Sequence, residues 1–207
     1  LIYFTLLLYL LVFLSTEIFS LLNILNVFSV RIFWLVILFF SILFLRKKNF
    51  FENINFKVLR NISLSKESYI IIFILLITFI NSIIYSPNTL DAMTYHMTKI
   101  MHWIQNGNVN FYPTNDLREL ILAPLSEYMV LNLYLITGGD YLSNLVQWYS
   151  MFVCCVTVSL ISNELKLDLK YQVFSSLFVV TLPMGILQSS STQTDYVTSM
   201  WLTMMVF

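Results

Sequence analysis

The feature that most constrains this chain is its series of apolar runs, each near the roughly 20 residues that an α-helix needs to cross a bilayer core. The first 45 residues carry only two charged side chains, Glu17 and Arg31, and are long enough for two such helices. Further apolar runs follow at 69–85, 141–161 and 171–187. The strands of a membrane β-barrel would alternate in polarity instead. We therefore predict an all-α integral membrane protein.

Composition agrees with a chain whose main surroundings are a lipid bilayer. Apolar residues make up 58% of the sequence and charged residues 11%, which lies outside the range of ordinary soluble domains. The formal net charge is zero. Because the chain has no overall positive charge that would attract nucleic acid, we expect no nucleic-acid partner. Cys154 and Cys155 are adjacent within an apolar run, where they cannot form a normal disulfide, and are predicted to be packing residues.

The predicted domain organisation is one transmembrane domain over residues 1–207, a polytopic helical bundle. Its spans are expected at 1–22, 27–45, 69–85, 141–161, 171–187 and, as an incomplete run, 196–207. The chain begins at Leu1 rather than Met and ends within that last run, so we expect it to be a fragment. Because no basic region precedes the first apolar segment, we interpret that segment as a retained helix rather than a signal peptide.

The distribution of basic residues predicts the orientation. Six of them crowd the loop 46–68: Arg46, Lys47, Lys48, Lys57, Arg60 and Lys66. The longer loop 86–140 carries only Lys99 and Arg118. By the positive-inside rule, loop 46–68 is cytoplasmic and loop 86–140 is external or periplasmic.

Residues 120–137 within the external loop permit two interpretations. They are apolar but interrupted by polar or helix-breaking residues such as Pro124 and Glu127, so they either span the membrane or lie along its surface. We favour the surface position, in which case Asp91 and Asp195 face the same side.

Residues 90–106 predict an amphipathic helix that lies along the membrane. At about 100° per residue, Asp91, Tyr95 and His102 share a polar arc, and methionines and isoleucines fill the opposite arc towards the acyl chains. Asp91 stands at the start of the helix, where the helix dipole favours the ionised form and suits a proton acceptor. The simpler alternative is a favourable terminal charge with no chemical role.

The remaining candidate binding residues lie in the same loop and at Asp195. They are Tyr95, His96, Lys99, His102, Asp116, Arg118, Glu119 and Asp195. His96 and His102 are about 120° apart on a helix, unlike the usual helical metal pair, so we do not expect one metal to bind both. A divalent metal is left open as a cofactor. Lys99, His102 and Trp103 also suit an anchor at the lipid headgroups. Asp195 is either a functional acid at membrane depth or a helix cap.

Parts of the external loop resemble bacterial membrane glycosyltransferases of the C fold (GT-C), which include protein O-mannosyltransferases and aminoarabinose transferases of lipid A. The stretches that carry the resemblance are Ser86–His96 (SPNTLDAMTYH), Met101–Asn106 (MHWIQN) and Tyr112–Thr114 (YPT). The similar region covers roughly 69–207. Relatives often show two prolines where this chain has Ala123-Pro124, and they usually have one span before the catalytic loop.

The resemblance implies a GT-C-like bundle in a bacterial plasma membrane with its active face outside. Asp91 would be the catalytic acid that assists transfer of a sugar from a polyprenyl-phosphate donor to a glycan, lipid or protein acceptor, with inversion at the anomeric carbon. Asp195 would be a second acid of the same cavity. The other candidate residues would bind substrate.

Other functions remain open from the sequence. A transporter or flippase of lipid-linked sugars would show internal repeats and helices broken near mid-membrane, but we find no repeat and the polar residues gather in one loop. A polymerase or ligase of another fold and a non-catalytic membrane subunit are further alternatives. The glycosyltransferase is the prediction we favour.

Overall fold

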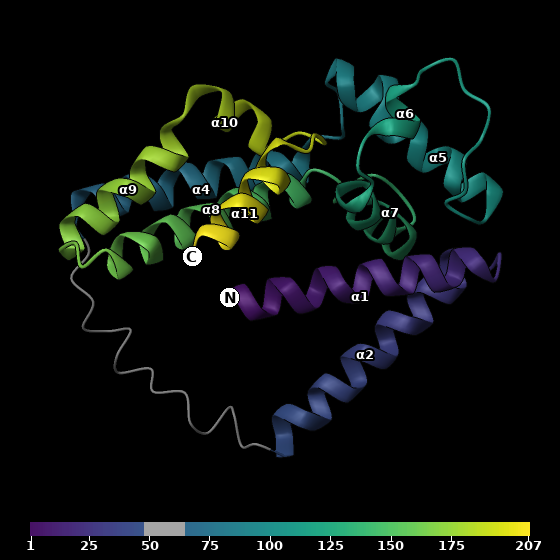
Figure 1. Ribbon diagram of the computed structural model, residues 1–207, viewed down its shortest axis with the longest axis horizontal. Coiled ribbons are helices and arrows are strands. Elements are labelled where there is room, and N and C mark those ends of the chain that lie inside the picture. The colour runs from purple at the N-terminus through teal and green to yellow at the C-terminus, as the bar shows by residue number, and fades with distance from the viewer. Residues whose placement is uncertain (48–64) are drawn as a thin grey trace.

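The computed structural model describes residues 1–47 and 65–207, and within those ranges it contains helices and no strands. The all-α prediction is therefore confirmed for this part of the chain (Figure 1). The elements are α1 (Ile2–Leu21), α2 (Val27–Lys47), α4 (Lys66–Ile84), the π-helical turn η1 (Ala92–His96), α5 (Met97–Asn106), α6 (Arg118–Ile121), α7 (Leu125–Thr137), α8 (Leu145–Glu164), α9 (Leu169–Thr181), α10 (Pro183–Ser189) and α11 (Asp195–Val206).

Four helices, α1, α2, α4 and α8, are long and apolar enough to cross a membrane, and the pair α9 and α10 could form a fifth, bent span. The chain thus has the helices of a multi-pass membrane protein. The four correspond to the predicted runs at 1–22, 27–45, 69–85 and 141–161, although α8 begins only at Leu145. Most of the predicted cytoplasmic loop 46–68, with Lys48, Lys57 and Arg60, lies outside the described residues.

The apolar run predicted as one span over 171–187 is bent. Helix α9 ends at Thr181, α10 begins at Pro183, and the two axes differ by 68°. Proline has no N–H to continue the hydrogen-bond ladder, and its ring pushes the preceding residue out of the helical region. Leu182 accordingly has extended backbone angles, φ −60° and ψ 120°. The chain bends at this point inside an otherwise apolar segment.

Helices α4, α8, α9 and α11 pack together as a bundle (Figure 1). At one end, the side chain of Asn144 donates to the carbonyl of Tyr85 at 2.8 Å and its Oδ1 lies 2.6 Å from the hydroxyl of Thr192. These bonds join the end of α4, the start of α8 and the segment before α11. Asp91 and Asp195 therefore emerge at the same end of the bundle.

The opposite end holds the turn between α8 and α9. Glu67 at the start of α4 and Lys170 at the start of α9 line one cavity there, so this turn lies at the end where α4 begins. Within the bundle, Cys154 and Cys155 are buried and unpaired. They serve as packing residues between neighbouring helices.

Helices α5, α6 and α7 form a separate layer beyond the end of the bundle where α4 finishes (Figure 1). Helix α7 has 13 residues, about 20 Å at 1.5 Å per residue, which is shorter than a bilayer core of about 30 Å. It lies across the hairpin of α1 and α2. The hydroxyl of Tyr128 donates to Glu17 Oε1 at 2.7 Å, and the indole of Trp34 donates to Asn132 Oδ1 at 3.0 Å.

Candidate functional site

Asp91 stands between the end of α4 and the π-helical turn η1, so the predicted helix over 90–106 is a π turn followed by the α-helix α5. Its side chain is 44% exposed, and its Oδ1 lies 3.9 Å from Nη1 of Arg118. The acid is thus open to solvent and faces a cation. Single π turns inside α-helices occur frequently at functional sites.

Arg118 is held in place by Asp116. Its Nη2 and Nε donate to the two oxygens of Asp116 at 2.6 Å and 3.0 Å, the forked geometry that suits a guanidinium and a carboxylate. Its guanidinium carbon lies 4.4 Å from the ring centre of Tyr95. Hydrogen bonds from Arg118 hold the pKa of Asp116 below its ordinary value. We call Asp91, Tyr95, Asp116 and Arg118 the Asp91 face.

Asp195 also approaches the Asp91 face. The pKa of Tyr95 is raised, first by partial burial, then by the charge of Asp91, and further by Asp195 and Glu127, while Arg118 lowers it. The charges of Asp91 and Asp195 therefore both act on this phenol. Asp195 is exposed at the start of α11 and lines a cavity of about 440 Å³ beside the bend between α9 and α10.

A second group of charged residues is buried one turn further along the same helix. Nδ1 of His96 lies 2.9 Å from Glu127 Oε1, and Nζ of Lys99 lies 3.9 Å from the same oxygen. Their side chains are only 2–4% exposed. Nζ of Lys99 also donates to the carbonyl of Leu122 at 3.0 Å. Burial lowers the pKa of Lys99, while Glu127 and Glu119 oppose that shift. We call His96, Lys99 and Glu127 the buried triad.

The alternative in which Lys99, His102 and Trp103 anchor the helix among lipid headgroups does not hold for Lys99 and Trp103. Both residues are 3% exposed because α7 packs over this face of α5. Met97 and Ile100, which were expected to face the acyl chains, are likewise buried inside the protein. Part of the apolar arc therefore packs against protein rather than lipid, whereas Met93 on the same arc remains exposed.

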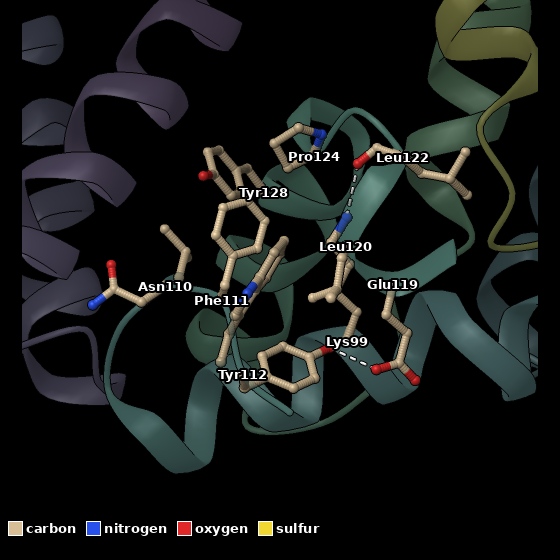
Figure 2. Close-up of a pocket in the computed structure, with 11 residues that line it drawn as sticks. Lys99, Asn110, Phe111, Tyr112, Glu119, Leu120, Leu122, Pro124 and Tyr128 are labelled. Carbon is tan, nitrogen blue, oxygen red and sulfur yellow. Dashed lines mark hydrogen bonds between the residues drawn. The ribbon is translucent and has the colours of Figure 1, made fainter. Parts of the chain in front are cut away.

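A third group contains Glu119, Tyr112 and His102. The hydroxyl of Tyr112 donates to Glu119 Oε2 at 2.9 Å, and the ring of His102 stacks on that of Tyr112 with centres 4.3 Å apart. Burial and the neighbouring carboxylate raise the pKa of Tyr112. Glu119 and Tyr112 line a cavity of about 150 Å³ together with Lys99 (Figure 2).

The predicted site residues thus separate into three places rather than one. Asp91, Tyr95, Asp116 and Arg118 lie together, with Asp195 near Tyr95. Glu127, one of the polar residues that interrupt the apolar stretch 120–137, is the partner of both His96 and Lys99. An acid inside an apolar segment was the available signal, because such a group requires a compensating partner.

Within residues 1–47 and 65–207, no group of three or more His, Cys, Asp and Glu side chains could hold a metal ion. His96 pairs with Glu127 and His102 stacks on Tyr112, so the two histidines belong to different groups. The divalent metal left open by the sequence has no ligand set among these residues.

Known proteins provide no further guide to the function of this site. No protein family, no characterised protein and no solved structure matches the chain. The similarity to GT-C enzymes therefore stays a prediction from the sequence.

Proposed function

We propose that this chain belongs to a membrane enzyme that transfers a sugar from a polyprenyl-phosphate donor to an acceptor at the outer face, with Asp91 as the catalytic base. The observation that carries the proposal is the half-exposed carboxylate of Asp91, 3.9 Å from Arg118, at the end of the apolar helix α4. A donor anchored by its lipid tail would present its phosphate at this level of the bilayer. An acid and a cation are the groups that transfer from a phosphate requires.

The proposed reaction uses the two groups in one step. The hydroxyl oxygen of the acceptor attacks the anomeric carbon, and the bond from that carbon to the phosphate oxygen breaks with its electron pair leaving on the lipid phosphate. Asp91 accepts the hydroxyl proton. Attack opposite the leaving group inverts the anomeric carbon.

Arg118 is the proposed partner of the leaving phosphate. Asp116 occupies its Nε and Nη2, and among the described residues its Nη1 makes no hydrogen bond. That group is available to donate to a phosphate oxygen, and such charge-assisted bonds are stronger than neutral ones. Tyr95 supports the guanidinium from one side. Asp195, near Tyr95, would orient the acceptor.

His96 and Lys99 do not extend to this face because both are buried against Glu127. In the proposed enzyme they are positioning residues that fix α5 under the Asp91 face. Glu119 lines the separate cavity of Figure 2. His102 does not line it but stacks on Tyr112, which does.

The test is sugar transfer from a polyprenyl-phosphate donor by membranes that contain the whole protein, with Asp91→Asn compared with the wild type at matched expression. Loss of a catalytic base is expected to reduce the rate about 10²- to 10⁴-fold. Asp140→Asn is the matched control, because Asp140 is an acid of the same loop whose carboxylate makes no hydrogen bond or ion pair in the part of the chain that the structure describes. Equal transfer by the wild type and Asp91→Asn would remove Asp91 from the mechanism.

One observation favours a transporter or flippase of lipid-linked sugars as the second candidate. The 68° bend between α9 and α10 breaks an apolar segment beside the cavity that contains Asp195, and broken helices next to polar groups are common in transporters. In proteoliposomes containing the whole protein, this function predicts donor movement across the bilayer that Asp195→Asn slows and Asp91→Asn leaves unchanged. Absence of donor movement, together with sugar transfer that Asp91→Asn reduces, would favour the enzyme.

A further inference from the structure

A cavity and a groove meet at the end of the bundle where α4 and α9 begin, opposite to the Asp91 face (Figure 1). The cavity has a volume of about 270 Å³ and is lined by the first residues of both helices. The groove, of about 260 Å³, is lined by α4, α8 and α9. Ser68 and Val173 line both spaces. The cavity and the groove therefore adjoin and form one elongated site.

The lining of this site changes from polar to apolar along α4. Its polar side chains gather in the cavity at the helix starts: Ser65, Glu67, Ser68 and Lys170. Aliphatic side chains follow in the groove: Ile71, Ile72, Val156 and Leu160. Ile72 lies about 8 Å further along α4 than Glu67. Because α4 is long and apolar enough to cross a membrane, the cavity lies at the level of the lipid headgroups and the groove at the level of the acyl chains. A ligand that matches this order is an amphiphile aligned with α4.

Lys170 brings a positive charge to the cavity that the fold itself does not use. It is the second residue of α9, where the helix dipole disfavours a cation. Within residues 1–47 and 65–207, its ammonium group makes no hydrogen bond and no ion pair. The start of α4 is already capped, because the hydroxyl of Ser65 accepts the backbone N–H of Ser68. The group in the cavity that is available to a phosphate is therefore the ammonium of Lys170.

The charges of the cavity suit a zwitterionic headgroup. Lys170 shares the lining with Glu67, and its charge acts on that carboxylate. A purely anionic headgroup would be repelled by Glu67 and a purely cationic one by Lys170, whereas a phosphate joined to an ammonium pairs with both. Among the described residues that line the cavity, Phe174 is the one aromatic side chain. Quaternary ammonium groups bind in cages of several aromatic rings. A primary ammonium, which can donate hydrogen bonds to Glu67, therefore fits better.

We propose that the site between α4, α8 and α9 binds one phospholipid of the phosphatidylethanolamine type, with its phosphate at Lys170, its ammonium at Glu67 and the first part of an acyl chain in the groove. Such a lipid combines the two opposite charges, the N–H donors and the apolar tail in the order in which the lining presents them. The proposal concerns the end of the bundle opposite to the Asp91 face and does not depend on sugar transfer.

The test is native mass spectrometry of the whole purified protein, titrated with phosphatidylethanolamine, phosphatidylcholine and phosphatidylglycerol. We expect one bound lipid, with phosphatidylethanolamine held about tenfold more tightly than the other two because its ammonium donates hydrogen bonds to a charged group. Lys170→Gln should weaken the binding of phosphatidylethanolamine about tenfold, since the phosphate loses a charge-assisted hydrogen bond. Glu67→Gln should reduce the preference over phosphatidylcholine to about threefold or less, because trimethylammonium has no N–H to lose.

Lys166→Gln is the matched control, because Lys166 is a lysine of the same turn that does not line the cavity, and it should bind the lipid as the wild type does. Glu67 and Lys170 are exposed, so their variants should keep the wild-type melting temperature, which is measured alongside. Equal affinity for the three lipids, tighter binding of phosphatidylglycerol, or unchanged affinity in both cavity variants would overturn the proposal. Phosphoethanolamine, a headgroup without a tail, should bind far more weakly, and equal affinity would overturn the role of the groove. A lipid-free dimer would assign the groove to a second copy of the chain instead.

Discussion

Two charged groups meet consecutive turns of the helical segment η1–α5, one through Tyr95 and the other through His96 and Lys99, and they differ in exposure and in the strength of their contacts. The Asp91 face is about half exposed, and its acid and Arg118 stand 3.9 Å apart without a hydrogen bond. The buried triad shares one carboxylate oxygen among a histidine at 2.9 Å and a lysine at 3.9 Å, with 2–4% of each side chain exposed. Exposed pairs contribute little to stability because water solvates both partners. Buried charges require their partners because water cannot replace them.

The difference teaches which group is available for chemistry. A substrate can displace the weak contact between Asp91 and Arg118 at small cost, whereas separating Glu127 from Lys99 would leave an isolated charge inside the protein. The Asp91 face is therefore available to a substrate, whereas the buried triad holds the helices together.

The largest expected effect is loss of stability in Glu127→Ala. Removing the shared carboxylate leaves the ammonium of Lys99 buried without a counter-charge, which costs about 3–5 kcal/mol. The measurement is equilibrium unfolding of the whole protein in mixed micelles. Glu164→Ala, at an exposed position at the end of α8, is the control and should change little. A loss below about 1 kcal/mol would show that the buried triad does not hold the helices together.

The second prediction concerns coupling within the buried triad. Lys99→Met and Glu127→Gln together replace both ions by neutral side chains of similar size, so the double variant should lose less stability than the sum of the single losses. The expected coupling energy is about 0.5–3 kcal/mol. Unfolding of the wild type, both single variants and the double variant measures it. Additive losses would mean that the two side chains do not interact.

The third prediction is a pH dependence that belongs to Lys99. Burial lowers its pKa in the folded protein, whereas an unfolded lysine titrates near about 10.4. Between the two pKa values the unfolded chain binds more protons, so stability rises with pH there. The cost of charging Lys99 is fully present below the folded pKa and vanishes above about 10.4. The free-energy difference between Lys99→Met and the wild type should therefore change across this window and level off beyond it. A difference that is constant with pH would contradict the lowered pKa.

The smallest expected effect is at the Asp91 face. Asp116→Asn removes the fork that holds Arg118, yet the melting temperature of the whole protein should stay within error because both side chains are solvated. Sugar transfer should fall less than in Asp91→Asn, since Arg118 loses its support but remains present. A large drop in melting temperature would show that the Asp91 face also holds the helices together and erase the distinction between the two groups.

Sequence reasoning succeeded where the signal was local. Apolar runs of helical length predicted the elements that became α1, α2, α4 and α8. It did not foresee the bend at Pro183, which divides the expected span into two helices at 68°. It also failed for Lys99, whose expected exposure assumed that lipid, not α7, covers this side of α5.

The sequence by itself determined that the chain is helical, that it suits a membrane, and which charged residues are available, because these properties follow from composition and from the repeat of the helix. Only the tertiary structure decided how those charges divide between the solvent and the interior. Pairing between residues as distant as His96 and Glu127, or Tyr128 and Glu17, depends on how α7 crosses its neighbours. That crossing follows from side-chain packing between separate helices, and no periodicity within one helix encodes it.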